Sequence, residues 1–428
     1  MKRLLALALS LALLAGCGTR PSAAPAAGSG EPARSSAQSQ AEPDPAPEPE
    51  PVPEPEQEPV VSHLMVAGDL LIHKTLNFDS YLSDSRSYDF THIMEGAAPQ
   101  LALADFALAN LETTLAGGPE YSGYPRFNSP DELARDAKAS GFDLLSTSNN
   151  HTLDKGVDGI FRTLDALDEI GMAHVGTYRT QEEWDENHGV YVADVGGISV
   201  AFLAYTYGLN GLRLPSDKMY AVNLFNLDYY TSLTNPDYEQ LESDMAYART
   251  LDTDLIAVIM HWGIEYRTAQ NAYQEKMAQF LVGQGADLVL GGHPHVLEPY
   301  ETVTALDPEG RERQGFVVYS LGNFISHQCS EDSRRDLGMR TTVVLDLELT
   351  RDAQGNTTLT DVRYTPYYML QQPRRPVGQR FHLLNIHQSI ADYEAGIEGI
   401  DKRTYNRLKE ALTLCHDILG EEGDKPSM

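Results

Sequence analysis

Cysteine is scarce in this sequence, with three residues in 428: Cys17, Cys329 and Cys415. Three cysteines build neither a disulfide framework nor a cysteine-based zinc site. A bridge between Cys329 and Cys415 is compatible with an exported protein. Two free, buried thiols are the simpler expectation.

Positive charge is also in short supply, because 32 Lys and Arg stand against 62 Asp and Glu, a formal net charge of -30. This balance argues against a nucleic-acid partner and against adhesion to anionic lipid by charge alone, since both need cations to neutralise phosphates. Neither a Gly-x4-Gly-Lys loop nor a Gly-x-Ser-x-Gly elbow is present. We therefore expect neither a nucleotide-driven enzyme with a phosphate-binding loop nor a serine hydrolase.

Long apolar runs are missing too, and the run at residues 4–15 is too short for a confident spanning helix. It follows Lys2 and Arg3 and ends in Leu-Ala-Gly-Cys17, which is typical of a signal peptide. The ending resembles a bacterial lipoprotein box, which implies cleavage after residue 16 and lipidation of Cys17. An ordinary signal peptide with a coincidental cysteine is the alternative. We expect an extracytoplasmic protein held at the cell membrane by a lipid anchor.

Residues 17–60 are rich in Pro, Ala, Ser and Glu. Such a segment cannot bury enough apolar surface to offset its ordering entropy, and alternating Pro with like charges favours an extended spacer. We assign residues 1–16 to the signal peptide and 17–60 to a disordered linker. Residues 61–370 are assigned to the folded domain and 371–428 to a C-terminal helical extension.

Beyond residue 60, short apolar runs alternate with amphipathic stretches, the pattern of βαβ units in an α/β fold. The pattern predicts strands at 60–71, 106–111, 142–147, 173–176, 190–194, 198–205, 255–260, 287–290, 317–320, 341–349 and 358–364. It predicts helices at 130–140, 158–170, 237–249, 274–284 and 403–419. Turns at 196–197 and 352–356 predict two hairpins.

Five of these strands end in polar residues of metal-ligand type. Each residue alone is a weak signal, because a Gly-Asp pair is more often a turn and a lone His is more often a core residue. Carboxyl ends of strands in open α/β sheets converge, however, and ligands bind there. The ordered set therefore predicts a site for divalent transition metals, at Asp69, Glu112, Asn150, His151, His261, His293 and His295.

The ordered motifs GD (68–69), NLE (110–112), SNNHTLDKG (148–156), HWGIEY (261–266), GGHPHVLEPYE (291–301) and YSLGNF (319–324) resemble a known family. They are similar to the CapA-type proteins of poly-γ-glutamate capsule biosynthesis, within the calcineurin-like metallophosphoesterase superfamily. The resemblance covers about residues 62–324. It implies a four-layer αββα sandwich with one or two divalent ions, such as Mn, Fe or Zn, at the strand ends.

The resemblance also implies roles for single residues. Asp69 and His295 would hold the first metal, Glu112 would bridge, and Asn150, His261 and His293 would hold the second. His151 would face the leaving group. Asp154 would orient His151, although capping the following helix is the alternative for its side chain.

One position departs from the family pattern. The superfamily places a histidine two residues after the first aspartate, where this chain has Leu71. His73 lies two residues further and is out of phase for that role unless the loop bends. One of the two metals would then be weakly held or absent.

Three functions remain open from the sequence. The first is a metal-dependent hydrolase of phosphoesterase type. The second is an accessory role in making or exporting an anionic surface polymer, and the third is a non-catalytic metal- or polymer-binding scaffold. Around the site, Trp262 and Tyr266 are expected as pocket walls, Glu265 as a substrate contact or an exposed residue, and Asn323 as a buttress in the 319–324 turn.

Overall fold

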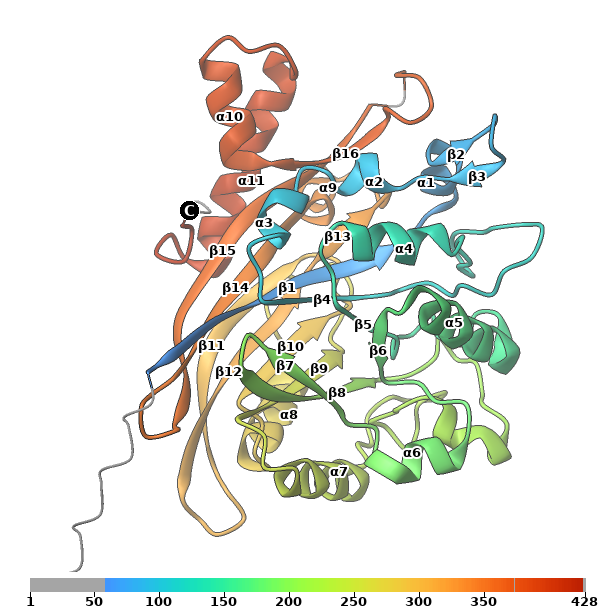
Figure 1. Cartoon of the computed structure of the whole chain (residues 1–428). Coiled ribbons are helices and arrows are strands. Elements are labelled where there is room, and N and C mark those ends of the chain that lie inside the picture. Colours follow the sequence, from blue (N-terminus) through green and yellow to red (C-terminus); the bar gives the residue numbers. More distant parts are fainter. Residues whose placement is uncertain (1–57, 373, 426–428) are drawn as a thin grey trace, which may run out of the picture. The chain divides into compact units, whose positions relative to one another are not determined.

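Two β-sheets lie face to face in the computed structural model, which describes residues 58–372 and 374–425 (Figure 1). The first sheet has the strand order β16-β15-β14-β1-β4-β5-β6, with β13 also paired to β1. The second has the order β11-β12-β10-β9-β8-β7. In the first sheet β1, β4, β5 and β6 run parallel, and in the second β8, β9, β10 and β12 do.

The first sheet comprises β1 (Val60–Leu71), β4 (Phe106–Asn110), β5 (Leu144–Ser146), β6 (Ala173–Val175), β13 (Asn323–Ser326), β14 (Thr341–Arg351), β15 (Thr357–Gln371) and β16 (Phe381–Asn385). The second comprises β7 (Tyr191–Val195), β8 (Ile198–Thr206), β9 (Leu255–His261), β10 (Leu288–Gly292), β11 (Leu297–Leu306) and β12 (Glu312–Leu321). Two short strands, β2 (Tyr81–Leu82) and β3 (Ser87–Tyr88), pair with each other.

Helices pack on both outer faces of this pair of sheets. The first sheet carries α1 (Lys74–Asp79), α2 (Thr91–Met94), α3 (Ala98–Leu101), α4 (Glu132–Ala139) and α5 (Gly156–Ile170). The second carries α7 (Tyr238–Thr250) and α8 (Ala272–Gly283). The remaining helices are α6 (Gln181–Asn187), a 3-10 helix η1 (Ser216–Ala221), α9 (Ser333–Arg340), α10 (Ile386–Glu394) and α11 (Lys402–Leu419).

Three apolar layers hold these elements together. One lies between the first sheet and its helices, one between the two sheets, and one between the second sheet and α7 and α8. Each fully buried Leu, Ile or Phe side chain contributes about 1.5–3 kcal/mol to such a layer. The α/β class and the four-layer αββα arrangement predicted from the sequence are confirmed.

Strand β9 shows how the sequence divides its side chains between two layers. Leu255, Ala257 and Ile259 face the first sheet, while Ile256, Val258 and Met260 face the helices. This is the period of two that a strand imposes. His261 continues the first set, so it stands at the rim of the space between the sheets.

The ends of individual helices follow local sequence signals. Helix α8 begins with a capping box between Asn271 and Gln274, which satisfies backbone N–H groups of its first turn. Helix α5 ends at Gly171, whose left-handed φ of 68° suits glycine. Helix α8 packs beside β10, which leads into His293 and His295.

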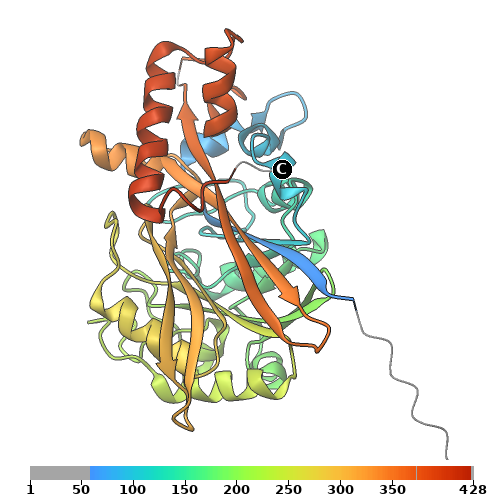
Figure 2. The same ribbon diagram turned by 90° about the vertical axis from the view of Figure 1, so that its left-hand side faces the viewer.

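Residues 371–425 contain a strand as well as helices. β16 pairs with β15, and α10 and α11 lie side by side at the end of the long β15 strand (Figure 2). Cys415 and Leu419 of α11 reach the layer between the sheets. The domain boundaries assigned from the sequence remain predictions.

Cys329 and Cys415 are free thiols. Cys415 is buried as expected, but Cys329 is exposed, so the expectation of two buried thiols is wrong for Cys329. Cys17 and the signal peptide lie outside the described residues. Within the described ranges, no helix combines the length and the apolar character that crossing a bilayer requires.

Candidate metal centre

The predicted ligands come together at the carboxyl ends of β1, β4, β5, β9 and β10, between the two sheets. His295 Nδ1 lies 3.6 Å from Asp69 Oδ2. His261 Nε2 lies 3.1 Å from Asn150 Oδ1. Donor atoms of Glu112, His293 and His295 all lie within 4.8 Å of one another. Residues distant in the sequence therefore share one small volume.

Glu112 stands between two groups of ligands. Its Oε1 lies 3.5 Å from His261 Nε2, on the side of Asn150. Its Oε2 lies 3.7 Å from His295 Nδ1, on the side of Asp69. Each carboxylate oxygen thus faces a different set of donors, which is the arrangement of a bridging carboxylate.

Several buried polar atoms in this cluster lack a hydrogen-bond partner in the described chain. They are both carboxylate oxygens of Glu112 and Nδ1 of His293. Leaving a buried polar group unpaired costs about 1–3 kcal/mol, and more when it is charged. A divalent cation would satisfy these atoms, so the donor set fits a metal.

The electrostatics of the cluster support the same fit. Burial raises the pKa of Glu112 well above its ordinary value, and the charges of Asp69 and Glu265 add to the effect. Burial also raises the pKa of Asp69, but its hydrogen bond with His295 and the charges of His261 and His295 outweigh that and leave it lowered. Burial lowers the pKa of His261 to about 3 and takes that of His293 well below its ordinary value. Neutral imidazoles and a carboxylate in need of a cation suit metal ligation.

The backbone around the ligands is held in uncommon conformations. His293 and His295 have φ values of 98° and 60°, in the left-handed region that side chains seldom adopt. Between β1 and β4 the register shifts between Val66 and Asp69, a bulge that re-aims a side chain. A Cβ on Gly292 would lie 3.0 Å from Asp69 Oδ1, so glycine leaves room for that carboxylate. Such strain concentrates at functional sites.

His151 and Asp154 form a pair beside the ligands. His151 Nδ1 lies 2.7 Å from Asp154 Oδ2, which also accepts the backbone N–H of Phe127 at 2.6 Å. Helix α5 is instead capped at Lys155, without a side-chain bond. The helix-capping alternative for Asp154 is therefore wrong, because its carboxylate turns to His151.

The departure from the family pattern on the first strand is real in the structure. Leu71 is buried, with 1% of its surface exposed. His73 Nδ1 lies 3.3 Å from the backbone nitrogen of His327 and 3.3 Å from the carbonyl oxygen of Leu71. Burial lowers the pKa of His73 to about 4.

The four expected pocket residues take different places. Trp262 belongs to the apolar layer under α7 and α8, where its indole N–H donates to the carbonyl of Tyr319 at 2.9 Å. It is a core residue rather than a pocket wall, because it continues the helix-facing set of β9. Glu265 is exposed, and Tyr266 is half-buried with its ring centroid 6.0 Å from that of His295. Asn323 Oδ1 lies 3.0 Å from His295 Nδ1, so Asn323 contacts the site directly.

Other site residues were missed in the sequence. Asn110 donates to Asp69 Oδ1 at 2.8 Å and lies 3.3 Å from His261 Nδ1. Asn149 donates to Asn110 Oδ1 at 3.2 Å, and Tyr207 accepts from Asn150 at 3.3 Å. Asn110 stands in register with Phe106 and Leu108 on the same face of β4, and this period was the signal available for it.

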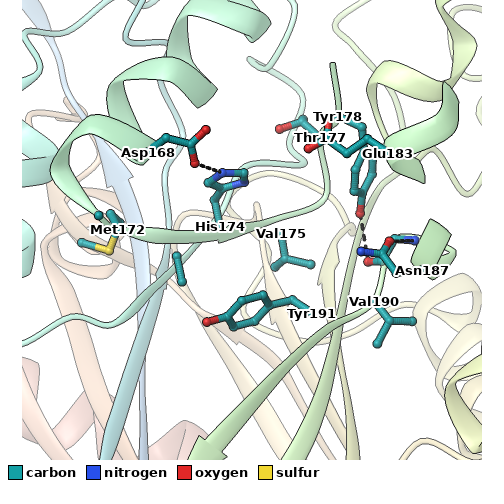
Figure 3. A pocket seen from close by; sticks show the side chains of 13 residues that line it. Asp168, Met172, His174, Val175, Thr177, Tyr178, Glu183, Asn187, Val190 and Tyr191 are labelled. Atoms are coloured by element: carbon teal, nitrogen blue, oxygen red, sulfur yellow. Dashed lines mark hydrogen bonds and ion pairs between the residues drawn. The ribbon is translucent and has the colours of Figure 1, made fainter. Parts of the chain in front are cut away.

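A cavity of about 410 Å³ lies away from the metal centre, beside the edge strands β6 and β7 (Figure 3). None of the predicted site residues lines it. His174 Nε2 is bonded to Asp168 Oδ1 at 3.1 Å, and the Tyr178 hydroxyl donates to the carbonyl of Gly189 at 2.9 Å. Unlike the Glu112 oxygens and His293 Nδ1, these groups have hydrogen-bond partners.

The family model for the bacterial capsule synthesis protein PGA_cap matches residues 63–328 of this chain. The chain belongs to this family. The matched range contains every predicted metal ligand, and the predicted membership is confirmed.

Two curated relatives carry capsule names. The capsule biosynthesis protein CapA of Bacillus anthracis is 28% identical over 248 residues, covering 56% of this chain and 55% of the relative. The PGA biosynthesis protein CapA of Bacillus subtilis (strain 168) is 26% identical over 239 residues, covering 55% and 57%. The chain thus spans a little over half the length of these relatives.

Similar solved structures include a NAD nucleotidase and a calcineurin-like phosphoesterase. The NAD nucleotidase NadN of Haemophilus influenzae has 12% identity and a TM-score of 0.44, over 86% of this chain and 65% of that chain. The calcineurin-like phosphoesterase YfkN of Bacillus subtilis has 12% identity and a TM-score of 0.39, over 84% and 98%.

Proposed function

We propose that this capsule synthesis protein is a metal-dependent hydrolase of phosphoesterase type that works on the outer side of the membrane. The observation that carries the proposal is the buried Glu112 carboxylate, whose two unpaired oxygens face two separate donor sets. Asp69 and His295 would hold one divalent ion, and Asn150, His261 and His293 a second. Such ions would supply Lewis acidity for a phosphoryl oxygen and a nucleophile from water at neutral pH.

The protein's own residues would handle the proton of the leaving group. Asp154 holds Nδ1 of His151 and leaves Nε2 as the nitrogen for proton transfer. The ring is packed against Phe127, with centroids 4.6 Å apart, which fixes its plane. A positioned imidazole of this kind contributes about 10²–10⁴-fold to a proton-transfer step.

Tethering to the membrane is part of the proposal. The Leu-Ala-Gly-Cys17 ending of the apolar run supports lipidation of Cys17, and the Pro- and Glu-rich residues that follow support a spacer. We propose an anionic surface polymer as the partner of the tethered protein, since the names of the two CapA relatives refer to capsule and PGA biosynthesis. A chain of net charge -30 repels a polyanion at long range, so contact would have to be local and mediated by metal.

A binding scaffold without catalysis is the second candidate. The buried Leu71 favours it, because the first metal position then has one imidazole fewer than the second. Polymer carboxylates are oxyanions that divalent ions at this site could hold. Cleavage of an amide rather than a phosphoester is, by contrast, a variant of the metal-dependent hydrolase.

Hydrolysis of generic phosphate mono- and diesters by the full chain in Mn²⁺ tests the proposal. We expect turnover that His151→Ala lowers by about 100-fold or more while the metal content stays the same. His293→Ala should lower the metal content itself. No turnover with any divalent ion, although the wild type binds metal, would favour the scaffold. A wild type without metal would overturn both readings.

A further inference from the structure

Asn323, the first residue of β13, has its side-chain amide fixed in one orientation. The NH₂ group lies within hydrogen-bond distance of three acceptors: the carbonyl oxygens of His295 and Met339, both at 3.3 Å, and Oε1 of Gln328 at 2.9 Å. An amide has only two N–H groups, so the donor side is fully used. The carbonyl oxygen must therefore point the opposite way.

That oxygen points into the metal centre. Asn323 Oδ1 lies 3.0 Å from His295 Nδ1. Asp69 Oδ2 and Glu112 Oε2 lie 3.6 and 3.7 Å from the same nitrogen. Three side-chain oxygens thus surround one imidazole nitrogen, and Glu112 Oε2 has no partner of its own among the described residues.

The fold makes this approach possible. Asp69 of β1 and Asn323 of β13 are direct partners in the parallel register. The two strands come so close that a Cβ on Gly68 would lie 1.9 Å from the carbonyl oxygen of Gly322. Glycine at these positions lets the backbone bring Asn323 beside the first ligand.

The two metal positions differ in the number of assigned donors. The second has four: Glu112, Asn150, His261 and His293. The first has three, from Asp69, Glu112 and His295, and divalent ions in proteins take at least four ligands in all, water included. We propose that the side-chain oxygen of Asn323 is the fourth protein ligand of the first position, an inference that rests on the proposed metal centre.

This assignment gives the two positions different chemistry. The first would have three oxygens and one nitrogen, and the second two oxygens and two nitrogens. Carboxylate and carbonyl oxygens suit Mn²⁺, whereas imidazoles suit Zn²⁺ and iron. The first position should therefore prefer the harder ion.

Metal titrations of the full chain with Asn323→Leu and Asn323→Asp test the assignment. We expect the wild type to bind two Co²⁺ ions and Asn323→Leu to bind the first about 10- to 100-fold more weakly. Its cobalt absorption at saturation should differ from that of the wild type, because the first ion has lost an oxygen ligand. Asn323→Asp, which keeps an oxygen there, should bind both ions. Gln328→Leu is the control, since it removes one contact of the amide and leaves Oδ1 in place.

The outcomes separate this assignment from the metal centre on which it rests. A wild type that binds no metal overturns the centre itself. Two ions in the wild type, with an unchanged cobalt spectrum in saturated Asn323→Leu, would show that Asn323 only positions His295. If Asn323→Leu does not fold, Asn323→Asp decides, because a first ion bound more weakly than in the wild type overturns the ligand role.

Discussion

Replacing Glu112 with glutamine should stabilise the metal-free protein and remove its response to metal. The Glu112 carboxylate is fully buried, and neither oxygen has a hydrogen-bond partner in the described chain. It also lies close enough to Asp69 for that charge to raise its pKa. An amide of the same shape carries no charge and can donate a hydrogen bond, so Glu112→Gln relieves this cost while weakening the bridge for metal.

The size of the effect follows from the burial. An unsatisfied buried polar group costs about 1–3 kcal/mol, so the free energy of unfolding in chelator should rise by about that amount. Roughly 370 folded residues have an unfolding entropy of about 0.8 kcal/mol/K, which makes the shift in Tm about 1–4 °C. An ion at a hundred times its Kd stabilises the wild type by about 2.7 kcal/mol, or about 3 °C, and Glu112→Gln should lose this gain.

The difference in stability between Glu112→Gln and the wild type in chelator should depend on pH in a definite direction. The pKa of Glu112 in the folded chain lies well above the ordinary value of 4.5. The folded state therefore holds this proton more tightly than the unfolded state, and its contribution to stability is lost as the pH rises through the folded pKa. The advantage of Glu112→Gln in chelator should be absent near pH 4 and should grow toward neutral pH.

Scanning calorimetry of the wild type and Glu112→Gln measures the stability in chelator, its change between about pH 4 and neutral pH, and the gain from Mn²⁺. The melting temperature of the wild type should rise by about 3 °C from chelator to Mn²⁺, and that of Glu112→Gln should not. A variant that is less stable in chelator and that gains as much from Mn²⁺ as the wild type would refute the reasoning.

Three further results are expected. When the pH is lowered from 6.5 in chelator, His261→Gln should gain stability relative to the wild type. The reason is that the pKa of His261 in the folded chain is about 3, so only the unfolded chain takes up a proton at this residue. Urea titrations at each pH measure the difference in unfolding free energy. Trp262→Ala should lose about 3–5 kcal/mol in urea unfolding with unchanged metal content, since Trp262 packs behind the site. Gly292→Ala should weaken metal binding by about 10- to 100-fold in calorimetric titrations, because its Cβ would press on Asp69. Equal binding by Gly292→Ala and the wild type would contradict that account of the glycine.

Local sequence patterns were sufficient to predict the strands that carry the proposed ligands. β1 begins and ends where its apolar run predicts, at Val60 and Leu71. The period of two along β9 places His261 between the sheets, and the same period places Trp262 on the other face. Trp262 was nevertheless predicted as a pocket wall, because its proximity to His261 in the sequence was given more weight than the alternation.

Long-range pairing could not be predicted from the sequence. β13 has four residues, and its position beside Asp69 depends on pairing with a strand some 250 residues earlier. Strands β11 and β16 and helices α9 and α10 were missed as well. Capping of the following helix stayed an alternative for Asp154, because its carboxylate meets His151 and the backbone of Phe127 only in the folded chain.

Anomalous diffraction from crystals of the full chain grown with Mn²⁺ tests the central claim most directly. Two peaks are expected, one on each side of the Glu112 carboxylate, with donor atoms of the six predicted ligands about 2 Å away. No peak between the sheets, or a single peak distant from Glu112, would contradict the account.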